Sequence, residues 1–212
     1  MPFPPVDPRI EDYMRVLASR HDEPVLLEME RLAKERSFPI VNRLVGELLE
    51  ILALSIGART VFEMGSGFGY SAYWFSRAVG PRGRVICTDG DPVNRAQAED
   101  FLSRVGRWDR IDYRVGWAQE ILRATPGPFD IIYCDINKEG YPEAFQLARD
   151  RIRPGGLYLC DNVLWSGRVT EAERDAATEA ILRHNELVYS DPAFDACIVP
   201  TRDGVLVARK RD

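Results

Sequence analysis

The chain has 212 residues, of which 45% are hydrophobic, and this is enough for one domain with a substantial core. Its 28 basic and 33 acidic residues give a net charge of −5, which provides no overall attraction to nucleic acid or to an anionic membrane and favours a small or neutral partner. The start of the chain lacks the apolar segment of a secretory signal and no apolar stretch reaches membrane-spanning length, so we expect a soluble cytoplasmic protein.

The first 57 residues are predicted to form a helical lead-in. Hydrophobic spacing predicts helices over residues 9–20, 23–36 and 41–56. From residue 59 onward, short strand-like runs alternate with helical segments, and such alternation predicts a parallel sheet covered by helices. The five runs are "RTVFEM", "RVICTD", "IDYRV", "DIIYCD" and "GLYLCD".

Turn and capping signals divide the rest of the chain. Asp91 and Pro92 predict the start of a helix that stops at Gly106, and "RPGG" at 153–156 predicts a break before the fifth strand. A helix is expected over 171–190. The runs "FDACIVP" and "GVLVARK" flank a hairpin turn at 201–204, which adds an antiparallel C-terminal strand at one edge of the sheet.

The four cysteines show no C-x-x-C spacing, and each lies in an apolar or β-branched run. This pattern predicts buried, reduced thiols rather than disulfides or zinc ligands, as is typical of cytoplasmic proteins. The residues are Cys87, Cys134, Cys160 and Cys197.

A glycine-rich loop directly follows the first predicted strand. Gly65, Gly67 and Gly69 would let a ligand lie against the backbone, and Asp89, at the end of the second strand, is placed to bind the hydroxyls of a ribose. The pattern predicts a nucleoside-binding crevice. Tyr70 stands where the dinucleotide fingerprint G-x-G-x-x-G has its last glycine, which disfavours NAD. The alternative is a tight turn followed by an exposed aspartate.

Two acids, an amide and a lysine follow the fourth and fifth strands. Asp135 ends one strand and Asp161 and Asn162 end the other, so the three side chains should meet at one edge of the sheet. Their oxygen atoms suit a hard divalent cation, Mg²⁺, Mn²⁺ or Ca²⁺. Lys138 follows Asp135 on the same loop, so its ammonium group could reach a substrate hydroxyl. A neighbouring dication lowers the pKa of a lysine, which would let Lys138 act as a general base. Alternatively these residues cap turns and the lysine is solvated.

These motifs together resemble the class I S-adenosylmethionine (SAM)-dependent methyltransferases, and among them the metal-dependent O-methyltransferases of the catechol and caffeoyl-coenzyme A type, including small bacterial members. The resemblance extends from "FPIVNRLVGELL" to the C-terminus and depends on "EMGSGFGYSA", "DINKEGY", "RPGG", "DNVLWSGRV" and "TRDGVLVARK". It implies a single α/β methyltransferase domain, with residues 1–57 as lead-in and 58–212 as core. The implied fold is a doubly wound, Rossmann-like, seven-stranded and mostly parallel sheet with an antiparallel C-terminal strand and helices on both faces.

The resemblance also implies a role for each site residue. Asp135, Asp161 and Asn162 match the metal ligands, Lys138 matches the general base, and Trp165 would lie beside an aromatic substrate. The cofactor-binding residues would be Val41, Glu63, Gly65, Gly67, Ser71, Asp89, Ala118, Gln119 and Asp135. Trp117 and Ala118 replace the acid that many relatives carry in the adenine segment, while Gln119 matches the catechol branch.

The expected activity is methyl transfer from SAM to a hydroxyl of a small aromatic acceptor, assisted by a divalent metal, in a homodimer. One alternative is methylation of hydroxylated uridine in tRNA, where Arg149, Arg151 and Arg153 could contact phosphates. Another is a nicotinamide-dependent oxidoreductase, and a third is a cofactor-binding module without catalysis.

Overall fold

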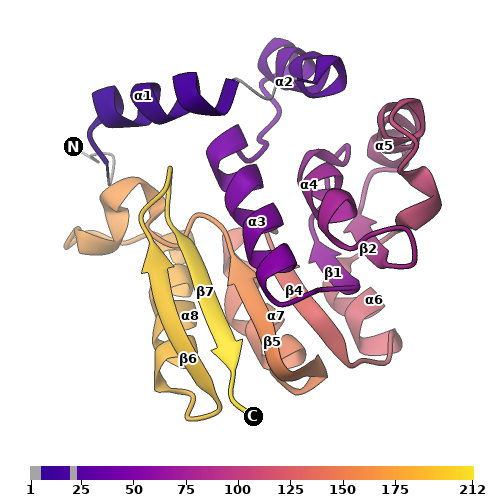
Figure 1. Ribbon diagram of the computed structural model, residues 1–212. Helices are drawn as coiled ribbons and strands as arrows, with labels where there is room; N and C mark the ends of the chain where they lie inside the picture. Colours follow the sequence, from indigo (N-terminus) through magenta and orange to yellow (C-terminus); the bar gives the residue numbers. More distant parts are fainter. Residues whose placement is uncertain (1–5, 20–22) are drawn as a thin grey trace.

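A computed structural model describes residues 6–19 and 23–212 of the chain. Its centre is a seven-stranded sheet with helices on both faces (Figure 1). The strand order is β3-β2-β1-β4-β5-β7-β6; β1 to β5 are parallel, and β7 runs antiparallel to both of its neighbours, β5 and β6. The predicted fold class is therefore confirmed. The strands are β1 (Thr60–Met64), β2 (Arg84–Asp89), β3 (Ile111–Val115), β4 (Phe129–Cys134), β5 (Ile152–Cys160), β6 (Phe194–Val199) and β7 (Val205–Lys210).

Successive residues of the central strands point to opposite faces of the sheet, so each face has its own hydrophobic core. Val61 packs in one core with the helices α2 to α5, while Phe62 packs in the other with α6, α7 and α8. The helices are α1 (Pro8–Ala18), α2 (Pro24–Arg36), α3 (Arg43–Ser55), α4 (Tyr70–Ala78), α5 (Pro92–Arg104), α6 (Ala118–Ala124), α7 (Tyr141–Ala148) and α8 (Ala176–Ser190).

Capping residues and hydrophobic spacing in the sequence predicted the first residue of most helices to within a few residues of the observed one. The Asp91 side chain accepts a hydrogen bond from the Val93 backbone N–H at 2.8 Å, and Pro92 is the first residue of α5, as predicted. The three N-terminal helices are present. Residue 20, the predicted end of the first, lies outside the described residues.

Three details differ from the sequence prediction. The segment "RPGG" belongs to β5 rather than to a break before it, because a register shift against β4 and a φ of +69° at Gly155 accommodate it within the strand. Helix α8 begins at Ala176, five residues later than predicted, where the Asp175 side chain caps it. Cys197 is exposed on β6, whose position at the sheet edge leaves it less covered, while the other three cysteines are buried free thiols.

The sheet order reverses between β1 and β4. The chain leaves β1 toward α4 on one face and leaves β4 toward α7 on the other, so the two connections diverge and open a crevice at the carboxyl ends of the strands. Within the described part of the chain, no helix is long and apolar enough to cross a membrane.

Candidate active site

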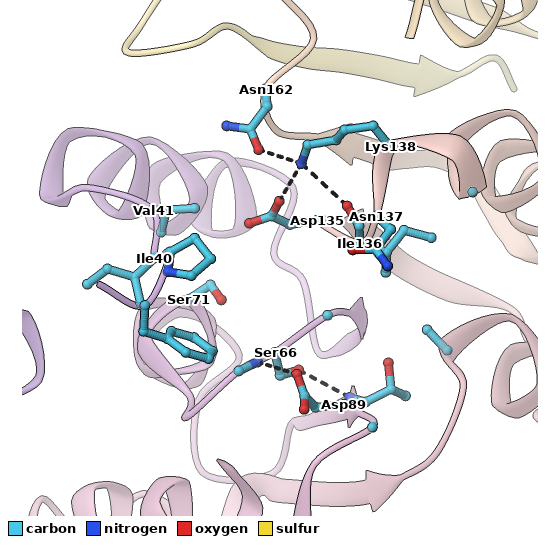
Figure 2. Close-up of a pocket in the computed structure, with 18 of the residues that line it drawn as sticks. Ile40, Val41, Ser66, Ser71, Asp89, Asp135, Ile136, Asn137, Lys138 and Asn162 are labelled. Carbon is cyan, nitrogen blue, oxygen red and sulfur yellow. Dashed lines mark hydrogen bonds and ion pairs between the residues drawn. The ribbon is translucent and has the colours of Figure 1, made fainter. Parts of the chain in front are cut away.

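The crevice holds a pocket of about 1000 Å³. The loops that follow the five parallel strands β1 to β5 form most of it, and the segment 38–41 before α3 closes one side (Figure 2). Figure 2 places Ile40 and Val41 opposite Asp135 and Lys138, with Asp89 farther along the pocket. The pocket therefore collects the predicted glycine loop, the ribose-binding acid and the acid, amide and lysine group in one space.

Gly65 and Gly67 leave no room for a side chain. Gly65 has a φ of +87°, and a Cβ there would lie 2.2 Å from the Asp135 carbonyl oxygen. A Cβ on Gly67, at φ +49°, would lie 2.9 Å from the Phe38 ring. The glycines thus bring the β1 loop against the β4 loop and the 38–41 segment, and they expose backbone to the pocket.

Asp89 is held in place by the glycine loop. Its Oδ2 accepts the Gly67 N–H at 3.1 Å, and its Oδ1 accepts from the Asn94 side chain and the Asp91 N–H, both at 2.9 Å. A carboxylate has about four acceptor positions. Oδ2 therefore keeps capacity for a ligand hydroxyl, as the prediction of ribose binding requires.

Other predicted cofactor-binding residues line the same pocket. Val41 is buried on the 38–41 segment, Ser71 lies in the first turn of α4, and Ala118 and Gln119 open α6. Trp117, just before them, also lines the pocket and is 70% exposed. A flat, exposed ring beside the β3 loop can cover an adenine-sized group.

Glu63 lies beneath the pocket rather than on its wall. The side chain is fully buried near the end of β1, and its Oε2 accepts the Ser66 hydroxyl at 2.6 Å. Burial raises the pKa of Glu63 to about 7, although hydrogen bonds from Ser66 and Ser71 oppose the rise. Because Ser66 lines the pocket, Glu63 fixes this residue from below.

Lys138 is the centre of the acid, amide and lysine group. Its Nζ lies 3.2 Å from the Asp135 carboxylate, 2.7 Å from Asn162 Oδ1 and 2.6 Å from the Tyr141 hydroxyl (Figure 2 draws the first two). The Tyr141 hydroxyl donates its own proton to the Asp161 carbonyl oxygen at 2.9 Å, so toward Lys138 it acts as an acceptor. Three residues from the β4 and β5 loops and α7 thus hold one ammonium group.

Asp161 is adjacent but fully buried. The Asp135 and Asp161 N–H groups donate to the last carbonyls of β1 and β4, which aligns the two acids at neighbouring strand ends. Burial, with a further contribution from the Asp135 charge, raises the pKa of Asp161 to about 7, while the Arg202 guanidinium opposes the rise. Arg202 Nη1 lies 3.3 Å from Oδ2, and Oδ1 has no hydrogen-bond partner among the described residues.

The donor set fits a divalent cation. The Asp135 carboxylate and the Asn162 amide oxygen converge on the Lys138 ammonium, while the carboxylate of Asp161, on the neighbouring strand end, is buried outside the pocket lining and keeps one unpartnered oxygen among the described residues. This set contains two acids and an amide. Among the described residues, no three His, Cys, Asp or Glu side chains lie together so that they could hold a metal ion.

Trp165 lines the pocket next to Lys138, whose Nζ lies 5.7 Å from the ring centre. Its backbone, at φ +49°, belongs to a tight stretch in which Asn162 and Ser166 also have left-handed conformations. The ring is thereby turned beside the acids, where an aromatic acceptor could stack on it.

Two residues of this group had no predicted role. Tyr141 stands within the motif "DINKEGY", and its three-residue spacing from Lys138 on a helical turn could have suggested the contact. Arg202 stands in the hairpin turn, 41 residues after Asp161, and nothing local in the sequence signals their ion pair.

Known proteins are similar to this chain over most of its length. A family model described as O-methyltransferase matches residues 17–211. Catechol O-methyltransferase of Niastella koreensis is 33% identical over 197 residues, which cover 90% of this chain and 89% of the relative. Catechol O-methyltransferase of Mycobacterium tuberculosis is 32% identical over 183 residues, covering 85% and 83%.

Solved structures are similar over nearly the whole chain. The O-methyltransferase TomG from Streptomyces achromogenes, in complex with SAM, superposes with a TM-score of 0.86 at 27% identity, covering 96% of each chain. An O-methyltransferase from Bacillus cereus, in complex with SAH, gives a TM-score of 0.85 at 26% identity, covering 96% of this chain and 97% of that one. These relatives favour neither a tRNA acceptor nor nicotinamide chemistry.

Proposed function

The chain belongs to the O-methyltransferase family, and we propose that it transfers a methyl group from SAM to a hydroxyl oxygen of a small catechol-like or caffeoyl-like aromatic acceptor. The observation that carries this proposal is the single pocket that holds the glycine loop and Asp89 at one end and Asp135, Lys138 and Asn162 at the other. A nucleoside cofactor and a hydroxylated acceptor fit these two ends.

In this proposal, a bound SAM supplies an electrophilic methyl group and a bound Mg²⁺, Mn²⁺ or Ca²⁺ supplies positive charge beside the acceptor oxygens. The glycine loop and Val41 hold the amino-acid part of the cofactor, Asp89 accepts the ribose hydroxyls, and Ala118 and Gln119 lie at the adenine side. The residues that would hold the cation are Asp135, Asp161 and Asn162.

Lys138 removes the hydroxyl proton from the acceptor at its Nζ. A cation that took Asp135 and Asn162 would release Nζ from both and favour its neutral, proton-accepting form, while the Tyr141 hydroxyl, 2.6 Å away, would still hold Nζ at the pocket wall. Trp165 positions the acceptor ring beside Lys138. The acceptor oxygen, once deprotonated, would be the nucleophile toward the methyl carbon, with the carbon–sulfur bond breaking and S-adenosylhomocysteine as the leaving group.

The test is transfer of labelled methyl from SAM to catechol, with and without Mg²⁺. Lys138→Met should reduce kcat by at least about a hundredfold, since general-base catalysis contributes about 10²–10⁴-fold. Lys34→Met removes a lysine from outside this pocket and should leave turnover of catechol unchanged. Asp135→Asn, Asp161→Asn and treatment with EDTA should each abolish turnover.

Two outcomes would contradict the proposal at different points. Full activity of the metal-stripped enzyme would overturn metal assistance alone. Methylation of hydroxylated tRNA, with no turnover of any catechol or caffeoyl compound, would overturn the acceptor class.

We also propose a homodimer in the cytoplasm. Apolar side chains of α1 project outward at helical spacing, with Ile10, Tyr13 and Val16 all more than half exposed, and Ile51 and Leu54 of α3 are likewise exposed. A second copy that covered them would remove this apolar surface from water. Sedimentation should give twice the chain mass of 24.1 kDa, and Tyr13→Glu should shift the protein toward monomer.

A further inference from the structure

Trp117 differs from the other three tryptophans of the chain in its exposure. Trp74, Trp108 and Trp165 are buried or partly buried, and each packs against one of the two hydrophobic cores. Trp117 is 70% exposed, more than any other large hydrophobic residue among those described, although it lines the first pocket. A ring that water surrounds adds little to the core, so its flat surface is free to cover a ligand in that pocket.

The backbone holds Trp117 close to the acid that is expected to bind the ribose. Asp89 and Val115 are partners in the register of β2 and β3, at the carboxyl ends of both strands. Just beyond them, the Gly116 N–H donates to the Asp89 carbonyl oxygen at 2.9 Å. Trp117 is the next residue, at the N-terminus of α6, so the sheet edge fixes its position relative to Asp89.

The strand order decides on which side of Asp89 the base of the cofactor lies. The glycine loop of β1, with Val41 beyond it, is on one side of β2, and the β3 loop is on the other. In SAM, the base and the methionine part are attached at opposite ends of the ribose, with the two hydroxyls between them. When Asp89 holds the hydroxyls and the methionine part follows the glycine loop, the base points toward the β3 loop and Trp117.

The neighbouring walls do not cover the face of a base. Gly90, next to Asp89, has no side chain, and a Cβ there would meet nothing within 4 Å. The Gln119 amide lies against the β4 loop, since a Cβ on Gly140 would lie 2.8 Å from Gln119 Nε2. An amide can form hydrogen bonds with the edge of a base, but the indole of Trp117 is the group at this end with a surface to match its face.

We propose that Trp117 stacks on the adenine of SAM and provides much of the affinity for the cofactor. The inference rests on the proposed function and identifies a residue that recognises the base of its cofactor. The base does not change during methyl transfer, so the stack stabilises the ground state and the transition state equally and acts on KM for SAM rather than on kcat. Lys138 and Trp165 lie at the other end of the pocket, so KM for the acceptor does not depend on Trp117.

The test is calorimetric binding of SAH to the wild type, Trp117→Ala and Trp117→Phe. Loss of one stack between a base and an aromatic ring should raise the Kd of Trp117→Ala about fivefold to thirtyfold, and the flat ring of Trp117→Phe should restore most of the affinity. Methylthioadenosine, which has the base and ribose without the amino-acid part, should lose affinity by the same factor. Tyr189→Ala removes an exposed ring of α8 outside the pocket and, as the matched control, should bind SAH like the wild type.

Kinetics and fluorescence separate stacking from a merely structural role. In Trp117→Ala, KM for SAM should rise with the Kd of SAH, while kcat and KM for catechol stay at their wild-type values. SAH should quench part of the tryptophan emission of the wild type, and most of this quenching should be lost in Trp117→Phe at saturating SAH. Because the ring is exposed, the melting temperature of ligand-free Trp117→Ala should match that of the wild type.

Two results would overturn the inference while leaving methyl transfer intact. One is an equal affinity of the wild type and Trp117→Ala for SAH. The other is a higher KM for catechol with unchanged SAH binding, because Trp117 would then contact the acceptor. A wild type that binds neither SAM nor SAH would refute the proposed function itself, and the inference with it.

Discussion

Replacing the buried Glu63 with glutamine should change how the stability of the protein depends on pH. Burial raises the pKa of Glu63 from its usual 4.5 to about 7 in the folded chain. An acid with a raised pKa binds its proton more tightly in the folded state than in the unfolded state. Its contribution to stability is therefore complete below pH 4.5 and is lost as the pH rises through 7.

The size of this effect follows from the two pKa values. The difference between 4.5 and about 7 corresponds to about 3 kcal/mol over the whole titration, of which about 2 kcal/mol is lost between roughly pH 5.5 and 8.5. Glu63→Gln should remove this loss. The amide oxygen can still accept the Ser66 hydroxyl, and the new NH₂ group replaces an oxygen that has no partner among the described residues.

The assay is urea unfolding at the two pH values, with the free energy of unfolding extrapolated to zero urea. Asp161 also has a pKa raised to about 7, but it titrates in both proteins and cancels in the comparison. Glu173→Gln, an exposed control, should keep the pH dependence of the wild type. If the curves of wild type and Glu63→Gln run parallel from pH 5.5 to 8.5, the argument from burial is refuted.

Three further predictions concern other parts of the fold. Gly65→Ala places a Cβ 2.2 Å from the Asp135 carbonyl oxygen at φ +87°, so it should destabilise the chain by more than about 2 kcal/mol and abolish SAM binding. Gly57→Ala, at φ +60° with nothing within 4 Å of the new Cβ, is the control and should cost only about 1–2 kcal/mol. Thermal unfolding measures the stability of both variants and calorimetry their SAM binding, and equal losses of stability would contradict the proposed clash at Gly65. Cys197 is the exposed thiol, so Ellman's reagent should modify one cysteine rapidly in the native protein and none in Cys197→Ser. Asp130 accepts two backbone N–H groups, a threonine hydroxyl and an arginine, so Asp130→Ala should cost about 3 kcal/mol in urea unfolding, and a loss below about 0.5 kcal/mol would show that these bonds are dispensable.

The placement of the acids at one edge could be predicted because it depends on local pattern and one topological rule. Apolar runs locate the strands, and the carboxyl ends of parallel strands share an edge, so Asp89, Asp135 and Asp161 had to lie along that edge. The predicted glycine loop has the same basis. Gly65 and Gly67 indeed leave no room for a Cβ, and their neighbours are the loops that the rule brings together.

Features that depend on packing between distant segments could not be predicted. Glu63 lies beneath the pocket because the loop at Ser66 folds over it, and the hydrophobic pattern of β1 would be the same if Glu63 faced the pocket. Similarly, "RPGG" has the composition of a break, yet it continues β5 because the register shift against β4 absorbs it. Sequence pattern locates an element better than it locates a side chain.

The two basic side chains at the site, Lys138 and Arg202, come from different parts of the chain. Asp135 is faced by Lys138 from its own loop, whereas the deeper Asp161 is faced by Arg202 from a hairpin at the far end of the chain. The acids and Lys138 are constrained by the sheet edge, but a hairpin tip tolerates substitution and changes of length. Because Arg202 also lines the pocket, a change at the hairpin would alter the pocket wall while leaving Lys138 in place. The pocket wall at Arg202 and the group around Lys138 can therefore vary separately in this fold, although the two acids that they contact lie at neighbouring strand ends.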